Sequence, residues 1–256
     1  MAVDKNIIII FVGLLGLAVG SFLNVLIIRT HDQTSPWRGR SRCPHCGHTL
    51  KWFELIPLVS FVWLLGRCRR CKKTINWQYP AVEFLTAAMF ISLTIHFGAT
   101  WLGLASFIVG SLMLTIAVYD LRWSMLPDIF SIVLSLSGLI VAWLMKLPWP
   151  DILFGLFGGL TFFGLQYILS RRRWVCSGDI LLGGALGMLL GWRLLALGLL
   201  LAYLSGAIAA IILLIIQQRK TSSAIAFGPF LIIGGYLAWL WGPQMIDWYF
   251  NHAIFH

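Results

Sequence analysis

The chain has 256 residues, of which 59% are hydrophobic and only 11% are charged. An ordinary soluble domain carries about 25% charged residues. The composition therefore excludes a disordered chain and argues against a soluble globular one, and it favours a protein embedded in a lipid bilayer. Lys and Arg number 19 against 9 Asp and Glu, a formal net charge of +10. In a membrane protein this excess is typical of cytoplasmic loops, so no nucleic-acid partner is expected.

Apolar segments recur along the whole chain with short gaps between them. A hydrocarbon core needs about 20 apolar residues per helix, and backbone groups in lipid must be hydrogen-bonded within their own segment. The pattern predicts an all-α fold, a polytopic membrane helical bundle of about eight transmembrane helices. The expected spans are Ile7–Ile28, Ala81–Phe97, Trp101–Tyr119, Ile129–Leu144, Ile152–Leu169, Ile180–Gly191, Leu194–Ile216 and Ile225–Trp241.

The sixth span has only 12 residues and is separated from the seventh by Trp192 and Arg193 alone. Two spans this close together must form a tight hairpin. The alternative is one long, broken helix from Ile180 to Ile216, which would change the number of spans. Glycines recur every four residues in the sixth span, at Gly183, Gly187 and Gly191, a spacing that favours close helix packing.

The distribution of basic residues predicts the orientation. If the loop after the first span is cytoplasmic, only Lys5, Lys146 and Arg193 of the 19 Lys and Arg fall on the opposite side. This asymmetry supports eight spans, with both termini extracytoplasmic. The expected organisation is a first transmembrane helix over residues 1–28, a cytoplasmic loop domain over 29–80 and a transmembrane bundle over 81–256.

The loop after the first span carries four of the five cysteines, in two CxxC pairs. The pairs are Cys43–Cys46 and Cys68–Cys71, and 22 positions separate Cys46 from Cys68. This spacing brings four thiolates to one tetrahedral ion and predicts a zinc site. Two redox dithiols are the alternative. Four thiolates leave no open coordination position, so the expected role of zinc is structural.

Four of the nine acids lie at or within span ends, where an ionisable group is a functional candidate: Glu83, Asp120, Asp128 and Asp179. Asp120 ends the third span and Asp179 opens the sixth, and both are expected on the cytoplasmic side. If they meet, they form a dyad in which one carboxylate activates water and the other donates a proton. The alternative for each is a helix-end carboxylate, which applies to Glu83 and Asp128 as well. The others are expected to be solvated in loops or termini: Asp4, Asp32, Glu54, Asp151 and Asp247.

Several motifs, in order, resemble those of the prepilin peptidases, also called type IV leader peptidases. The resemblance rests on Gly20-Ser-Phe-Leu-Asn-Val25, the two cysteine motifs, Ile56-Pro57, Tyr79-Pro-Ala-Val-Glu83, Asp120-Leu-Arg122, Leu126-Pro-Asp128, Ser177-Gly-Asp179 and Phe227-Gly-Pro-Phe230. It implies an intramembrane aspartic protease of the GxGD type in the bacterial cytoplasmic (inner) membrane. The implied substrates are prepilins or pseudopilins of type IV pilus and type II secretion systems.

The resemblance also implies the roles of individual residues. Asp120 and Asp179 match the catalytic pair of the family. The cysteine loop is associated with members that also N-methylate the new N-terminus using S-adenosylmethionine, so this second cofactor is implied here.

Three features depart from the family pattern, and the first is that a Pro usually found soon after the position of Arg29 is missing. Strict spacing puts Cys176 at the first Gly of GxGD, where a side chain can restrict the backbone. Leu181 stands where a Lys is common. The rival interpretations are a proton-coupled membrane transporter and a zinc-stabilised membrane scaffold.

Overall fold

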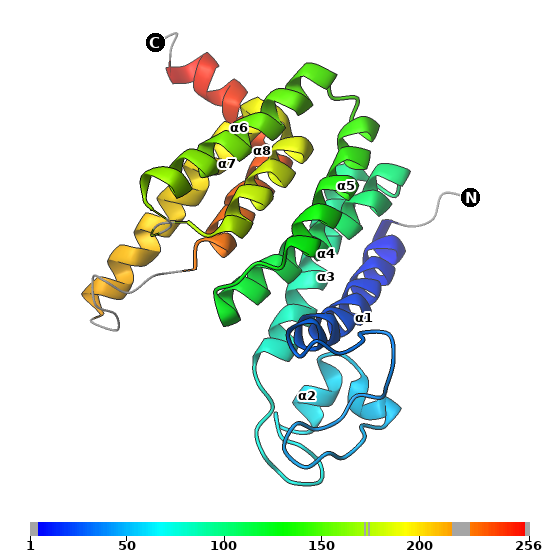
Figure 1. The fold of residues 1–256 in the computed structure, drawn as a ribbon. Helices are drawn as coiled ribbons and strands as arrows, with labels where there is room; N and C mark the ends of the chain where they lie inside the picture. The colour runs from blue at the N-terminus through cyan, green and yellow to red at the C-terminus, as the bar shows by residue number, and fades with distance from the viewer. Residues whose placement is uncertain (1–4, 172, 174, 217–225, 254–256) are drawn as a thin grey trace. The chain divides into compact units, whose positions relative to one another are not determined.

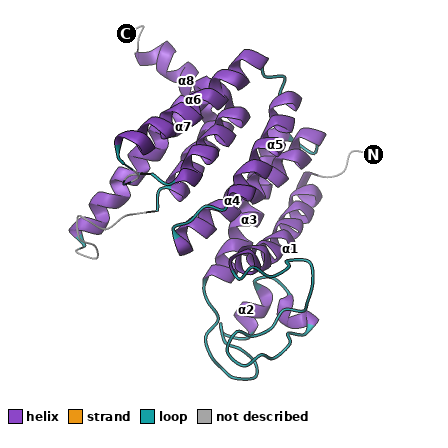
Figure 2. Ribbon diagram, in the orientation of Figure 1, coloured by secondary structure: helices purple, strands orange, loops and turns teal. Residues whose placement is uncertain are grey.

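A computed structural model describes residues 5–171, 173, 175–216 and 226–253. In this part of the chain helices dominate, and the only strand-like features are two isolated bridges in the cysteine loop (Figure 2). The elements in chain order are α1 (Lys5–His31), the 3-10 helix η1 (Trp52–Leu55), α2 (Val59–Trp63), α3 (Gln78–Phe97), α4 (Trp101–Trp123), α5 (Asp128–Leu144), α6 (Trp149–Leu169), α7 (Ser177–Ile215) and α8 (Gly228–Ala253) (Figure 1).

The prediction of an all-α membrane protein is confirmed. Five described helices are long and apolar enough to cross a membrane, namely α1, α3, α4, α6 and α7, and α5 is a shorter apolar helix. The first five predicted spans fall within α1 and α3 to α6. The sixth lies within α7, the seventh ends one residue beyond it, and the last overlaps α8. A few residues used in the predictions lie outside the described residues: Asp4, Arg172, Arg219, Lys220 and Ile225.

The chain forms two compact units, Met1–Thr115 and Ile116–His256, which divide within α4. In the first unit, α1 and α3 pack with their backbones in contact. A Cβ on Gly16 would lie 2.6 Å from the Cα of Ala87, and one on Gly20 would lie 2.7 Å from the Cα of Glu83. The Asn24 side chain also donates a hydrogen bond to the carbonyl of Tyr79 (3.1 Å). The cysteine loop therefore leaves α1 and returns to α3 at neighbouring points.

In the second unit, α7 is interrupted at Gly191, where φ is 71° and ψ is 171°. Before the break, the backbone of Gly187 contacts Gly155 of α6 and that of Gly183 contacts Gly159. This order means that the first part of α7 runs antiparallel to α6. The glycines predicted to allow close packing therefore do so.

After Gly191 the direction of α7 relative to α6 is reversed. A Cβ on Gly158 would be in contact with Leu195, and further along both helices the Tyr203 hydroxyl donates to Gln166 (2.9 Å). The second part of α7 thus runs parallel to α6, and the chain folds back at Gly191. The hairpin prediction is confirmed, with Gly191 supplying a backbone conformation that L-residues rarely adopt.

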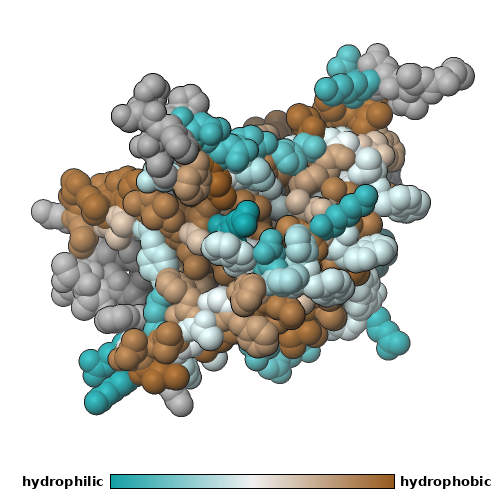
Figure 3. All heavy atoms as spheres, turned by 90° about the horizontal axis from the view of Figure 1, so that it is seen from above, coloured by the Kyte–Doolittle hydropathy of each residue, from teal (hydrophilic) through white to brown (hydrophobic). Residues whose placement is uncertain are grey.

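The helices expose large apolar side chains, as membrane-facing surfaces must. On α6, for example, Phe154 is 67% exposed and Ile168 is 72% exposed. Figure 3 shows apolar residues over much of one face of the molecule. In water such a surface would favour aggregation, so the exposure agrees with the membrane assignment.

Candidate active site and metal site

Asp120 lies in the last turn of α4 and is buried, with 6% of its surface exposed. Its Oδ2 accepts a hydrogen bond from the backbone N–H of Gly228 (2.9 Å), the first residue of α8. A Cβ on Gly228 would lie 2.6 Å from the same oxygen. Only glycine therefore allows the start of α8 to approach the carboxylate this closely.

Asp179 is the third residue of α7 and is also 6% exposed. Its Oδ2 accepts a hydrogen bond from the backbone N–H of Cys176 (2.8 Å), the residue before the helix. The preceding Gly178 packs so closely on Leu126 that an added Cβ would lie 2.6 Å from the Leu126 Cβ. The carboxylate thus stabilises the N-terminus of α7 through one of its two oxygens.

The thiol of Cys176 lies close enough to Asp120 and Asp179 to be affected by their charges. Partial burial raises the pKa of this thiol, and the negative charges of Asp179 and Asp120 raise it further. The two buried carboxylates and the thiol therefore share one electrostatic environment, at the converging ends of α4, α7 and α8.

The four cysteines of the loop gather at one point in the first unit. Their sulfur atoms all lie within 4.8 Å of one another, and the Sγ atoms of Cys43 and Cys71 are 3.9 Å apart. Bonds of about 2.3 Å to a tetrahedral zinc ion place sulfurs about 3.8 Å apart. The cluster therefore fits a metal ion bound by four thiolates.

The two CxxC turns have the same backbone structure, 25 positions apart. In the first, Gly47 N–H donates to Cys43 O (2.9 Å); in the second, Lys72 N–H donates to Cys68 O (2.9 Å). Gly47 and Lys72 both have positive φ, 67° and 60°. The backbone N–H of Cys71 lowers the pKa of the Cys68 thiol to about 7.

The chain is similar to known proteins over most of its length. Residues 14–97 match the model of the bacterial peptidase A24 N-terminal domain, and residues 107–211 match that of the type IV leader peptidase family. The chain is 34% identical to a prepilin leader peptidase/N-methyltransferase of Pseudomonas aeruginosa, over 94% of this chain and 93% of the relative. The chain belongs to the type IV leader peptidase family.

Other relatives carry related names. A prepilin leader peptidase/N-methyltransferase of Myxococcus xanthus is 38% identical over 82% of this chain and 64% of its own length. A type 4 prepilin-like proteins leader peptide-processing enzyme of Escherichia coli O78:H11 is 34% identical over 86% of this chain and 89% of its own length. No solved structure gives a significant match.

The departures from the family pattern leave the local backbone intact. Cys176 has φ −86° and ψ 162°, an extended conformation open to any residue, so its side chain does not strain the turn before Asp179. Leu181 is 36% exposed in the first turns of α7. Asp128 is exposed at the first position of α5, the helix-start carboxylate expected as its alternative interpretation.

Glu83 is buried in α3, and its Oε2 accepts the backbone N–H of Leu58 (2.9 Å). Leu58 has a positive φ of 57°. This contact fixes the segment before α2 to the start of α3. It is a structural role, distinct from the role predicted for Asp120 and Asp179.

The prediction that Glu54 is solvated is wrong. Its side chain is only 2% exposed, because η1 turns it inward between the two CxxC turns. The available signal was an acid within the apolar stretch from Trp52 to Ile56. The structural role of Arg29 was not predicted either. Its guanidinium donates hydrogen bonds to the carbonyls of Ser35 (3.1 Å) and Gly39 (3.1 Å) and so holds the start of the cysteine loop against the end of α1.

Proposed function

We propose that this protein is a membrane-embedded aspartic endopeptidase that removes the basic leader of type IV prepilins or pseudopilins at the cytoplasmic membrane face. The observation that carries the proposal is the pair of buried carboxylates, Asp120 and Asp179, held by backbone N–H groups at the ends of two helices. The names of the relatives supply the substrate class.

In the proposed reaction, the carboxylate of one Asp removes a proton from water as the water attacks the scissile carbonyl carbon. The protonated carboxyl group of the other Asp donates its proton to the carbonyl oxygen. The tetrahedral intermediate collapses as the C–N bond breaks and the leaving amine takes a proton. The products are the leader's carboxylate and a new N-terminal amine, with no covalent enzyme intermediate.

The second proposed activity is N-methylation of that amine. S-adenosylmethionine would supply the methyl group from its sulfonium sulfur: the S–CH3 bond would break as the amine nitrogen bonds to the methyl carbon and loses a proton, and S-adenosylhomocysteine would leave. Zinc, held by Cys43, Cys46, Cys68 and Cys71, would fix the two CxxC turns to each other and take no part in either reaction, because all four ligand positions are filled.

The proposed location is the bacterial inner membrane, with both termini extracytoplasmic and the cysteine loop, residues 29–80, in the cytoplasm. The bundle over residues 81–256 would carry the peptidase. The support is the concentration of Lys and Arg on one side of the predicted topology. This orientation puts Asp120 and Asp179 on the side where the basic leader of the substrate lies.

The direct test is incubation of the purified protein, in detergent, with a prepilin. We expect a product shortened by the length of the leader, identified by mass spectrometry, and a further gain of one methyl group when S-adenosylmethionine is added. A prepilin left uncut would contradict the proposal and favour one of the two rival interpretations, a proton-coupled transporter or a zinc-stabilised scaffold. Family membership favours neither of these rivals.

Replacing Gly228 with Ala is expected to lower the cleavage rate by about 100-fold, because the new Cβ displaces Asp120 from its hydrogen bond with α8. The measurement is the initial rate of prepilin cleavage. The matched control is Gly164→Ala in α6, where an added Cβ meets nothing within 4 Å. A normal rate for Gly228→Ala, or an equal loss for Gly164→Ala, would contradict this assignment.

A further inference from the structure

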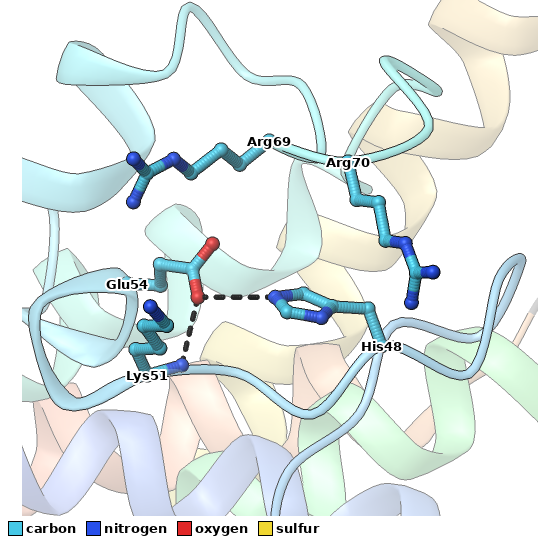
Figure 4. A pocket seen from close by; sticks show the side chains of 5 residues that line it. All are labelled: His48, Lys51, Glu54, Arg69 and Arg70. Atoms are coloured by element: carbon cyan, nitrogen blue, oxygen red, sulfur yellow. Dashed lines mark hydrogen bonds and ion pairs between the residues drawn. The ribbon is translucent and has the colours of Figure 1, made fainter.

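A pocket of about 380 Å³ lies between the two CxxC turns of the first unit. It is lined by His48 and Lys51 after the first turn, by Glu54 of η1, and by Arg69 and Arg70 within the second (Figure 4). The volume is within the range of about 300–1,000 Å³ that is usual for small-molecule sites. The predicted zinc site and the predicted dyad do not use these side chains.

Glu54 contributes a buried carboxylate in which only one of the two oxygens has a polar partner. Its Oε2 accepts the backbone N–H of Lys51 (2.7 Å) and lies 3.6 Å from Nε2 of His48. Its Oε1 is buried and has no hydrogen-bond partner in the described part of the protein. In Figure 4 this second oxygen points away from both contacts, toward the part of the chain that carries Arg69 and Arg70. A buried carboxylate oxygen without a donor is costly, so the site is suited to a ligand that supplies one.

The remaining lining is cationic. Lys51, Arg69 and Arg70 bring three positive side chains to a pocket with a single carboxylate. The guanidinium of Arg69 lies 5.3 Å from the ring centroid of Phe53, which steadies it beside η1. Arginine side chains in this position favour a carboxylate or another planar anion.

These two features together select a zwitterion. A simple anion would satisfy the cations but leave the Glu54 oxygen without a donor. A basic peptide would supply the donor but meet three positive charges. An α-amino-acid head group carries an ammonium and a carboxylate on one carbon, so it satisfies both sides of the pocket.

We propose that this pocket binds the α-amino-acid head group of S-adenosylmethionine, with Glu54 accepting from its ammonium and Arg69, Arg70 and Lys51 binding its carboxylate. The inference rests on the methyltransferase part of the proposed function, and it assigns the methyl donor a binding site in the cysteine loop. It makes Glu54 and the two arginines binding residues for the methyl donor, separate from the residues proposed for cleavage.

The test is equilibrium binding of S-adenosylhomocysteine and of 5′-methylthioadenosine to the full-length protein by isothermal titration calorimetry. Only the first ligand carries the amino-acid head group. We expect Glu54→Gln, and separately the double change Arg69→Ala and Arg70→Ala, to weaken S-adenosylhomocysteine at least about tenfold. The weaker binding of 5′-methylthioadenosine should not change. Asp32→Asn, an exposed acid in the same loop, is the matched control and should bind both ligands as the wild type does.

Several outcomes would overturn the inference: no binding of S-adenosylhomocysteine to the wild type, unchanged binding by Glu54→Gln, or equal loss of both ligands. Free methionine binding as tightly as S-adenosylhomocysteine would also do so, because the pocket would then be a general amino-acid site. Zinc content, measured on each variant, reports whether the loop has kept its fold. Leader cleavage is assayed separately, so failure of the peptidase proposal is distinguishable from failure of this one.

Discussion

Replacing either Asp120 or Asp179 with Asn is expected to abolish leader cleavage, with a loss of at least about 10³-fold in rate. Asn has nearly the same shape as Asp and still accepts the hydrogen bond from Gly228 or from Cys176 through its carbonyl oxygen. What it loses is the capacity to take or give a proton. In the proposed mechanism both carboxyl groups move protons in one step, so the double variant should be little worse than either single one.

Two other acids provide matched controls for this experiment. Asp128→Asn changes an exposed carboxylate at the start of α5, and Asp247→Asn changes an exposed one in α8. Both should cleave at near wild-type rates. The Asp120 and Asp179 variants should still insert in the membrane, elute as the wild type does and retain zinc. Near-normal cleavage by either dyad variant, in a purified assay, would exclude the proposed chemistry, and inactivity of Asp128→Asn would show that the wrong carboxylates had been chosen.

The methyltransferase reaction separates loss of the peptidase from loss of the fold. A prepilin already cut by the wild-type protein, when given to the Asp120→Asn variant with S-adenosylmethionine, should still gain a methyl group. This is expected because the proposed binding residues for the methyl donor, Glu54, Arg69 and Arg70, belong to the cysteine loop.

The helices were predictable because their signal is local. Each span is a run of apolar residues of membrane length, and each CxxC pair fixes its own turn through hydrogen bonds over four residues, as Cys43 and Gly47 show. The hairpin at Gly191 could also be predicted, because only Trp192 and Arg193 separate the apolar segment that ends there from the next one. In these cases the physical cause and the sequence signal occupy the same short segment.

The missed features depend on contacts between distant parts of the chain. Gly228 and Asp120 are 108 positions apart, so nothing near Asp120 indicates that a glycine must start α8 beside it. The burial of Glu54 depends likewise on the second CxxC turn, since Arg69 and Arg70 complete the pocket around it. A residue-by-residue analysis treats an acid in a loop as solvated, and it fails where the loop has its own folded core.

Replacing Cys68 with Ser is expected to reduce bound zinc from one ion per chain to almost none. A structural zinc ion in a four-ligand site contributes free energy of folding directly, and the loop has few buried apolar residues to replace it. Ser keeps the size of the side chain but offers no thiolate at neutral pH. We therefore expect this variant to lose zinc and to be cut rapidly by trypsin between Arg38 and Lys73, a segment rich in Lys and Arg.

The fifth cysteine is the matched control for this prediction. Cys176 belongs to the second unit and is not one of the four clustered cysteines, so Cys176→Ser should keep its zinc and its resistance to trypsin. It should also keep leader cleavage, because Asp179 accepts from the backbone N–H of residue 176 and not from its side chain. Metal analysis by mass spectrometry, limited trypsin digestion and the prepilin assay give the three readouts. Full zinc content in Cys68→Ser would show that Cys68 is not a ligand, and a wild-type protein without zinc would favour two redox dithiols over a four-thiolate site.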